Sequence, residues 1–334
     1  MKIAVVNSGS SSLKFKLFEM PRGEVIYEKL VEHSGEGIES LNVDFTKVDA
    51  IGHRVVHGGE KFKNPVLIDD EVIAEIKNLI PLAPLHNPAN LEGIRVLRKK
   101  FPKIPQIAVF DTAFHSSLEK EAYIYALPYK MYEEKNIRRY GFHGSSHSYL
   151  LKQAAKILGK KVEDTNIITL HLGNGASACA IKNGKSCDTS MGFTPLEGLV
   201  MGSRCGDIDP AIILYLQREY DYTIQEIDTL LNKQSGLLGL CGTNDVRDIL
   251  NAVDVKSKLA IDIMVRRIQK YIGAYMILLE DVDAIVFSGG IGENSTQIQK
   301  AVMNNKIIKN IKSLVIKTNE EFEIANECLE VLKK

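Results

Sequence analysis

The sequence lacks three features that would narrow its function at once: an excess of one charge, long apolar runs and paired cysteines. Lysine plus arginine and aspartate plus glutamate both total 42 in 334 residues, so no overall field favours nucleic acid or an anionic membrane. No run approaches the roughly 18 apolar residues of a membrane span, and the N-terminus reaches Asn7 too soon for a signal-peptide core. We therefore expect a cytoplasmic protein that binds neither nucleic acid nor membrane.

The cysteines are few and scattered. The five are Cys179, Cys187, Cys205, Cys241 and Cys328, and none forms a C-x-x-C motif. This pattern argues against a disulfide framework and against a zinc site, and it favours a reducing compartment. In contrast, the hydrophobic content of 45% and the charged content of 25% are typical of a globular protein, and the length suffices for two domains.

Apolar strand patterns alternate with capped helical patterns along the chain. The expected strands are Ile3–Val6, Leu13–Phe18, Ala50–Val56, Ile107–Phe110, Ile167–Leu172, Ala176–Ile181 and Ala284–Phe287. One helix is expected after an Asn87 N-cap and a second after Asp209-Pro210. A third begins at a Thr223–Glu226 capping box, with Gly236 as its stop. A fourth runs from about Val255 to Leu279, and the last begins at Glu320, capped by Thr318 or Asn319. In the long helix Leu259, Ile263, Ile268, Ile272 and Met276 are expected in the core. The alternation predicts an α/β protein with mostly covered sheets.

Two pairs of segments repeat in the same order. IAVVNSGSSSLKFKL resembles ITLHLGNGASACAIK, with Gly9 matching Gly175 and Ser11 matching Ser177. Further along, VDAIGHRVVHGGE resembles VDAIVFSGGIGE. Chance accounts for either match alone, but the two together favour duplication of one fold.

Glycine turns recur at NSGSSS, HLGNG and SGGIGENS. Glycine allows successive backbone N–H groups to point the same way and bind an anion. A plain hairpin turn is an equally good reading of any single one. Three such turns in a duplicated framework favour a bound nucleotide.

Two arginines lie beside glycines, Arg54 in GHRVVHGGE and Arg204 in MGSRCGDIDP. Phosphoryl transfer needs such arginines to neutralise the charge of the transferred group. The alternative is that they are surface residues paired with Asp207 or Asp209.

Other polar residues carry weaker signals. His143 and His147 are four residues apart, as in some metal pairs, but the H-E-x-x-H pattern is absent and a loop histidine that binds a substrate oxygen fits better. Asp111 ends an apolar strand, where α/β proteins place functional side chains. The helix dipole alone accounts for Glu320 in the first turn of the last helix.

Taken together, the motifs resemble those of the acetate kinase family. They are N-x-G-S-S-S-L-K, GHRVVHGG, APLHNP, FDTAFH, YGFHG-S-SH, HLGNG, DTSMGFTPLEGL-MG-RCGDIDP and GIGENS, and they cover almost the whole chain. The resemblance implies two duplicated ribonuclease H-like domains of the actin-like ATPase type with a cleft between them. The first comprises residues 1–115 and a C-terminal helix, 322–334, and the second comprises residues 116–321.

The resemblance also implies roles for individual residues. Arg54, Arg204, Asp111 and His143 are the catalytic set, in which Arg204 and His143 stabilise the transition state. Arg54, Val56, Leu85, Phe142 and Pro195 bind the substrate. The nucleotide set is Ser10, Ser12, Lys14, His171, Leu172, Gly173, Asn174, Gly175, Asp245, Val246, Arg247, Gly290, Ile291, Gly292 and Asn294. Asn7 and Glu320 match positions associated with magnesium.

The implied reaction is reversible in-line transfer of the γ-phosphoryl group of ATP to acetate by a homodimer with Mg²⁺, which Mn²⁺ can replace. A carboxylate with a pKa near ~4–5 is already ionised at pH 7, so the reaction needs cationic groups rather than a general base. Propionate or butyrate kinase of the same family is one alternative. A non-catalytic ATP switch on the actin-like fold is another, although a switch does not need a carboxylate site.

Three stretches are shorter than is typical of the family. They lie between Lys14 and His53, between Asn294 and Thr318, and at Cys241–Asp245, beside the expected adenosine site. We expect the first two to remove peripheral loops or hairpins and to leave the site intact.

Overall fold

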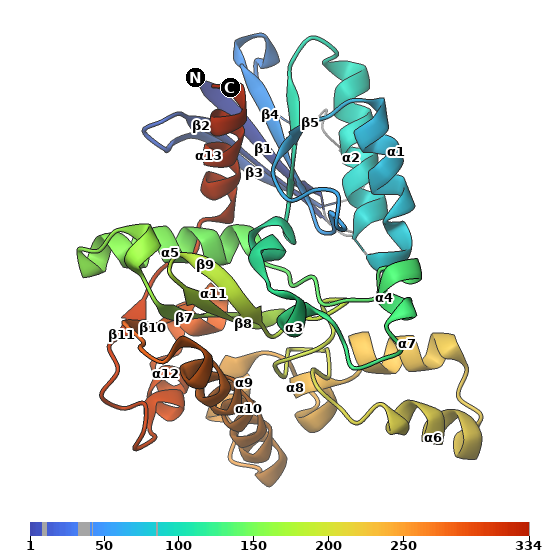
Figure 1. Ribbon diagram of the computed structural model, residues 1–334, viewed down its shortest axis with the longest axis vertical. Helices are drawn as coiled ribbons and strands as arrows, with labels where there is room; N and C mark the ends of the chain where they lie inside the picture. Colours follow the sequence, from blue (N-terminus) through green and yellow to red (C-terminus); the bar gives the residue numbers. More distant parts are fainter. Residues whose placement is uncertain (9–11, 33–40, 42, 85, 334) are drawn as a thin grey trace. The chain divides into compact units, whose positions relative to one another are not determined.

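The structure, a computed structural model, describes residues 1–8, 12–32, 41, 43–84 and 86–333. The chain divides into two units. The first is formed by Met1–Ser116, Phe142–Tyr149 and Asn319–Lys334, and the second by Ser117–Gly141 and Leu150–Thr318 (Figure 1). The polypeptide therefore leaves the first unit and returns to it twice.

The first unit is built on one mixed sheet. Its strands are β1 (Lys2–Ser8), β2 (Ser12–Glu19), β3 (Glu24–Glu32), β4 (Ala50–Val55), β5 (Val66–Leu67) and β6 (Gln106–Phe110), in the order β3-β2-β1-β4-β6-β5. Its helices are α1 (Asp70–Asn78), α2 (Asn87–Lys100), the first residues of α5 (Gly144–Leu158) and α13 (Glu320–Leu332). Short 3₁₀ turns lie at Phe45–Lys47, Ile80–Leu82 and Ala113–Ser117.

Alternation along β1 supplies both faces of this sheet. Ile3 and Val5 pack with Ile324 and Cys328 of α13, while Ala4 and Val6 belong to a cluster on the opposite face. A third cluster joins Val55 and Phe110 to the apolar sides of α1 and α2, which lie side by side (Figure 1). Because both faces are covered, the strand ends of β4 and β6 are held rigidly.

The second unit has its own mixed sheet. Its strands are β7 (Ile167–Leu172), β8 (Ala176–Lys182), β9 (Lys185–Thr189), β10 (Ala284–Ser288) and β11 (Ser313–Val315), in the order β11-β10-β7-β8-β9. Its helices are α3 (Lys120–Tyr123), α4 (Lys130–Lys135), the rest of α5, α6 (Ala211–Tyr220), α7 (Ile224–Lys233), α8 (Gly236–Cys241), α9 (Val246–Asn251), α10 (Val255–Leu279), α11 (Gly289–Asn294) and α12 (Thr296–Met303). A 3₁₀ turn lies at Val162–Asp164.

The two sheets share one strand topology. In the first, β1 pairs antiparallel with β2 and parallel with β4, and β4 pairs parallel with β6. In the second, β7 pairs antiparallel with β8 and parallel with β10, and β10 pairs parallel with β11. The predicted α/β class with duplicated halves is confirmed, although Gly9 and Ser11 of the repeat lie outside the described residues.

Three helix predictions need correction. Asn87 is the first residue of α2 and not its N-cap, because its buried amide accepts a hydrogen bond from His57 N (3.1 Å) and donates one to His57 O (3.2 Å). Gly236 begins α8, since α7 already ends at Lys233. Leu259 is exposed, and Met264 and Tyr275 join Ile268 and Ile272 on the buried side of α10.

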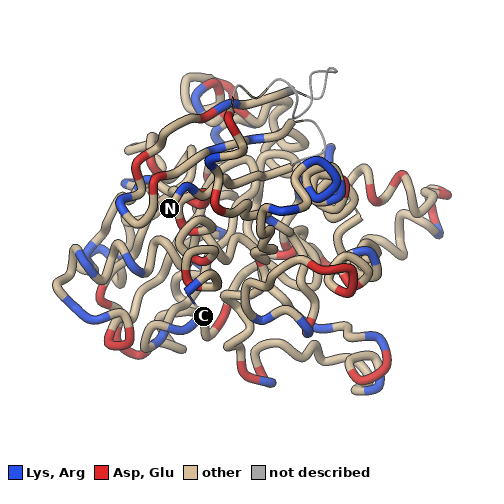
Figure 2. The backbone as a smooth tube through the Cα atoms, turned by 90° about the horizontal axis from the view of Figure 1, so that it is seen from above, with Lys and Arg blue, Asp and Glu red and all other residues tan. Residues whose placement is uncertain are grey.

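Within the part of the chain that the structure describes, no helix combines the length and the apolar character needed to cross a bilayer. Basic and acidic residues are interspersed along the backbone (Figure 2). This distribution agrees with the equal totals of the two charge types.

Candidate active site

Arg54 and Asp111 form a bidentate ion pair in the first unit. Arg54 lies in β4 and Asp111 directly follows β6, so the parallel pairing of these strands brings the two side chains to one edge of the sheet. Nε donates to Oδ1 at 2.9 Å and Nη2 donates to Oδ2 at 2.7 Å. Burial works to lower the pKa of the Arg54 guanidinium, but the carboxylates of Asp111 and Glu320 raise it, and the net shift is upward.

Asp111 itself is only 2% exposed. Burial raises the pKa of its carboxyl group, and the Arg54 guanidinium opposes that shift. We take the pair as ionised because two parallel charge-assisted hydrogen bonds fix both partners. The arrangement orients the guanidinium and leaves Nη1 outside the pair with Asp111.

The first turn of α13 supplies carboxylates to the same unit. Glu320 lies 3.9 Å from Arg54 Nη1, and Glu321 lies 2.6 Å from Lys14 Nζ. Asn319 caps the helix by accepting a hydrogen bond from Phe322 N, as the sequence predicts. Lys14 is therefore already paired with a carboxylate, a partner that the sequence did not reveal.

His143 has a left-handed backbone, with φ of 58°, at the start of α5. The next residue, Gly144, donates from its N–H to Asp111 O at 2.9 Å, and a side chain there would collide with that carbonyl. Asp111 and His143 are thus held in adjoining turns of the first unit. Phe142 is buried, with its ring centroid 5.5 Å from that of His57.

The remaining predicted residues of the first unit are placed separately. Val56 is buried, and its N–H donates to Asn90 Oδ1 at 3.1 Å. Asn7 lies opposite Lys14 in the β1–β2 register, and Ser12 begins β2. Ser10 and Leu85 lie outside the described residues.

A cavity of about 740 Å³ in the second unit gathers most of the predicted adenosine residues. Its walls include Gly173, Asn174, Asp245, Val246, Arg247, Gly290, Ile291 and Asn294. They also include Asn244, Leu250, Asn251, Ser295, Thr296 and Gln297, which the sequence analysis missed although they flank the predicted segments. Apolar side chains and amide groups together suit a purine nucleoside.

The turns around this cavity are fixed by backbone geometry. Gly289 precedes the wall residue Gly290 with φ of 77°, and a side chain on it would collide with the Leu172 backbone. Asp245 caps α9 through Arg247 N (2.9 Å) and holds the Arg247 guanidinium (2.6 Å). The Arg247 hydrogen bonds lower the pKa of Asp245 to about 2.

Four further predicted nucleotide residues lie at or near the turn between β7 and β8. His171 and Leu172 end β7, Gly175 accepts a hydrogen bond from Gly173 N at 3.0 Å, and Gly292 lies in α11. His171 pairs with Ser288 at the end of β10. His171 and Ser288 thus lie at the carboxyl ends of two neighbouring parallel strands of the second sheet.

Arg204 differs from Arg54 in having no acidic partner among the described residues. Its Nη1 donates to the carbonyl of Pro195 at 2.7 Å, and burial lowers the pKa of its guanidinium. The alternative of a surface pair is wrong, because Asp207 binds Arg267 and Asp209 accepts from Ala211 N. A half-buried cation without a carboxylate is ready to bind an anion.

The described residues contain no cluster of three or more histidine, cysteine, aspartate or glutamate side chains that could hold a metal ion. A zinc site at His143 and His147 therefore receives no support. Magnesium differs, since it keeps several waters and binds through one or two protein oxygens plus phosphates. The oxygen atoms of Asn7 and Glu320 fit that requirement.

Comparison with known proteins places this geometry in a family. The profile of the acetokinase family matches residues 37–330. The chain belongs to the acetokinase family. It is 51% identical to an acetate kinase from Sulfurimonas denitrificans and 45% identical to one from Campylobacter lari, in each case with 100% of both chains covered.

Solved structures of the acetokinase family show the same fold. The acetate kinase of Porphyromonas gingivalis matches with a TM-score of 0.89 at 38% identity, covering 99% of each chain. A propionate kinase from Francisella tularensis matches with a TM-score of 0.91 at 41% identity, covering 98% of each chain. The actin-like ATPase fold and membership of a family of ATP-dependent kinases are thereby confirmed.

The alignment with the first of these relatives leaves gaps in this chain. Its alignment with the Sulfurimonas protein spans 388 positions, whereas the chain has 334 residues, so 54 positions are missing from it. Two of the three segments that the sequence analysis found short precede β4 and α13, and neither contains Arg54, Asp111 or Glu320. The third, Cys241–Asp245, contains Asp245 of the nucleotide cavity. None of the predicted catalytic residues Arg54, Asp111, His143 and Arg204 lies in the three short segments.

Proposed function

We propose that this protein transfers the γ-phosphoryl group of ATP to acetate, forming acetyl phosphate and ADP reversibly. The observation that carries the proposal is Arg204, a half-buried guanidinium with no acidic partner among the described residues, in a chain of the acetokinase family. An anionic substrate would complete its charge balance. We choose acetate among the carboxylates because the relatives named above are mostly acetate kinases.

The reaction needs little chemistry from the protein. One carboxylate oxygen of acetate attacks the γ-phosphorus, the bond from that phosphorus to the β,γ-bridging oxygen breaks, and the electron pair leaves with ADP. Acetate is already ionised, so no proton has to move. Rate enhancement comes from placing two anions together and from stabilising charge on the three equatorial oxygens.

The proposal gives each group of predicted residues a role. Arg54, oriented by Asp111, binds the carboxylate or the phosphoryl group, while Arg204 and His143 stabilise the transferred group. Val56, Phe142 and Pro195 contact the methyl group, with Leu85 as a further predicted contact. The cavity at Asp245 and Gly290 binds the nucleoside, and the turn at Asn174 lies beside the phosphates.

Mg²⁺ would be held by Asn7 and Glu320 together with phosphate oxygens. When bound, it supplies positive charge to the phosphates. Mn²⁺ has similar oxygen chemistry and is expected to replace it.

We also propose a cytoplasmic homodimer. The sequence of α6 begins with the apolar run AIILYL, yet none of its residues is buried. Ile212, Leu214 and Tyr215 are exposed. An apolar helix without cover in the monomer supports association with a second copy. Sedimentation at micromolar concentration tests this, and a monomer there would contradict it.

A single assay tests the main proposal. ATP and Mg²⁺ are incubated with acetate, propionate or butyrate, and acyl phosphate is trapped as hydroxamate. Acetyl hydroxamate should form fastest. Faster reaction with propionate would favour the propionate kinase alternative, and ATP binding without any acyl phosphate would favour an ATP switch.

A further inference from the structure

The segment that carries Pro195 and Arg204 contains neither helix nor strand. It runs from Ser190 to Pro210, between β9 and α6 of the second unit, and buries Met191, Leu199 and Met201. Ordered connections of this length are uncommon and need side chains to fix them. Whatever holds this loop also sets the position of Arg204.

Glu197 lies at the centre of the contacts that hold it. Its Oε1 accepts a hydrogen bond from Arg139 Nη2 at 2.6 Å, and its Oε2 accepts a short one from the Tyr125 hydroxyl. The same hydroxyl accepts from Phe193 N at 2.9 Å. A side chain on Gly192 would collide with both the carboxylate and the hydroxyl, so the backbone packs directly against this pair.

Arg139 ties the carboxylate to the end of β9. Its Nη1 donates to the carbonyls of Thr189 (2.9 Å) and Met191 (3.0 Å). Burial works to lower the pKa of its guanidinium, but Glu197 raises it, and the net shift is upward. Burial also raises the pKa of the Tyr125 hydroxyl, which therefore remains a hydrogen-bond donor.

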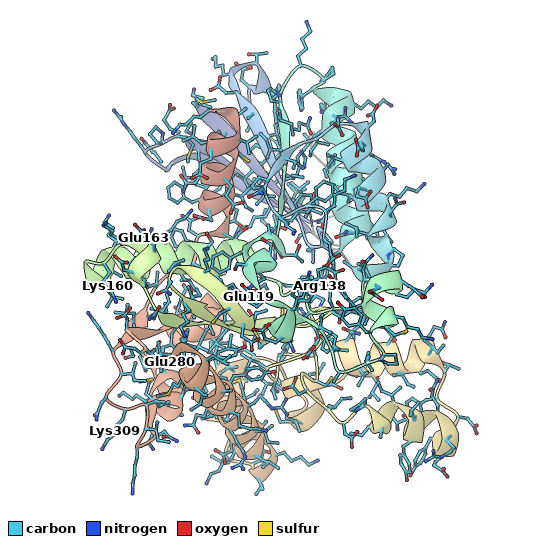
Figure 3. All side chains as sticks on the ribbon, in the orientation of Figure 1. Glu119, Arg138, Lys160, Glu163, Glu280 and Lys309 are labelled. Atoms are coloured by element: carbon cyan, nitrogen blue, oxygen red, sulfur yellow. The ribbon has the colours of Figure 1, made fainter. Side chains whose placement is uncertain are left out.

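The residues that present Arg139 are themselves anchored. Its N–H donates to Tyr123 O at 2.7 Å, and Tyr140 N donates to Gly192 O at 3.0 Å. The neighbouring Arg138, labelled in Figure 3, places its guanidinium carbon 3.5 Å from the Tyr123 ring centroid. Hydrogen bonds thus hold both Glu197 and its partner Arg139 in place, as a preorganised site requires.

We propose that Glu197 is a positioning residue that fixes Pro195, and through Pro195 the guanidinium of Arg204, for acetate. Pro195 lies two residues before Glu197, and its carbonyl accepts from Arg204 Nη1 at 2.7 Å. One residue position therefore controls both the methyl contact and the anion contact. This inference rests on the proposed acyl kinase activity.

The test is the ratio of kcat/KM for acetate to kcat/KM for propionate in Glu197→Gln. The substitution keeps the shape of the side chain but removes its charge and one acceptor. A loosened Pro195 should enlarge the methyl site, so the ratio should shift toward propionate by about threefold to tenfold, and the KM for acetate should rise about tenfold. The KM for ATP should stay within about twofold, because Glu197 is not a wall of the nucleotide cavity.

This ratio distinguishes positioning from a merely structural role. A variant that is partly unfolded loses activity equally for both acids, and its ratio stays that of the wild type. Asp283→Asn is the matched control, since Asp283 is also partly buried and paired with a cation, Lys160, and accepts from Asn166 N. Lys160 is labelled in Figure 3. Its ratio should not change.

The outcomes separate the two proposals. An active wild type with an unchanged ratio in Glu197→Gln overturns the positioning role and leaves the kinase proposal standing. A wild type that forms no acyl phosphate overturns both. If Glu197→Gln does not fold, Tyr125→Phe removes only one hydroxyl from the contacts and should shift the ratio in the same direction by a smaller factor.

Discussion

Arg54 donates two parallel hydrogen bonds to Asp111, from Nε to Oδ1 at 2.9 Å and from Nη2 to Oδ2 at 2.7 Å. Arg54 lies in β4 and Asp111 directly follows β6, its parallel neighbour in a sheet that is covered on both faces. The guanidinium plane is therefore set by the fold before any ligand arrives. We expect the buried carboxylate of Asp111 to orient the Arg54 guanidinium, and the first prediction follows from that role.

Asp111→Asn should keep the fold but lose the orientation of Arg54. An amide NH₂ would face one guanidinium N–H, so we expect kcat/KM for acetate to fall by about 100- to 1000-fold and the free energy of unfolding to fall by about 3 kcal/mol. Steady-state kinetics and urea unfolding measure the two effects. Asp70→Asn is the control because its pair with Arg98 is exposed, and it should change neither. Normal turnover in Asp111→Asn would refute the orienting role.

Arg204→Ala should lower kcat by about 1000-fold if this guanidinium stabilises the transferred phosphoryl group. The affinity for ATP should be unchanged, since Arg204 is not a wall of the nucleotide cavity. Arg204→Lys should recover only part of the activity, because an ammonium cannot bind the carbonyl of Pro195 and an anion in the same plane. Isothermal titration with ATP and kinetics with acetate separate these effects. Arg266→Ala, on the exposed side of α10, is the control. A near-normal kcat in Arg204→Ala would show that Arg204 does not stabilise the transferred group.

Gly290→Val should raise the Kd for ATP without lowering stability. Gly290 is a wall of the nucleotide cavity, and a Cβ atom on it meets no atom within 4 Å, so we expect the valine methyl groups to occupy ligand space. We expect the Kd to rise by about tenfold or more, because two methyl groups would clash with the nucleoside. Gly273→Val is the matched control, since it also meets nothing within 4 Å but lies in α10, away from the cavity. Equal ATP affinity in both variants would place the nucleotide elsewhere.

His53 makes stability depend on pH. Burial lowers its pKa to about 4, and the hydrogen bond with Gln106 opposes that shift only in part. Between pH 4 and 6.5 the unfolded chain therefore binds more protons at this position, so stability is fully present above pH 6.5 and falls as the pH drops. From pH 7 to pH 5 the loss should be about 2 kcal/mol.

Urea unfolding at the two pH values measures this loss in the wild type and in His53→Gln. The glutamine amide nitrogen takes the place of His53 Nε2 and can still donate to Gln106, but it cannot take up a proton, so the pH-dependent loss should shrink by about the same 2 kcal/mol. Comparing the change with pH in each protein removes any constant cost of the substitution. The same dependence in both proteins would show that other groups cause it.

Strong local signals made much of the fold predictable. The structure contains the predicted apolar strands at Ile3–Val6 and Ile167–Leu172 and the capping box at Thr223 and Glu226. These were predictable because periodicity and capping act within a few residues. The strands β3 and β9 were missed. Their sequences, EVIYEKLVE and KSCDT, are rich in charged and polar residues, and pairing with β2 and β8 supplies the ladder that their own sequences do not announce.

The sequence alone singles out candidate site residues where motifs lie next to glycine or at strand ends, as for Arg54 and Arg204. It does not single out partners from distant segments. No local pattern indicates that Glu321 pairs with Lys14, or that Arg139 and Tyr125 both bind Glu197, because these contacts depend on tertiary structure. The roles of the site residues stay predictions, and the variants above test them.

The return of the chain to the first unit through α13 bears on how the protein is made. Ile324 and Cys328 cover the face of the first sheet formed by Ile3 and Val5, yet the ribosome synthesises the whole second unit in between. A nascent chain therefore carries an uncovered apolar sheet until α13 emerges. Vectorial folding from the N-terminus cannot be completed, and the second unit has the first opportunity to become stable. For most of translation, the sheet that bears Arg54 is a surface on which chaperones can act.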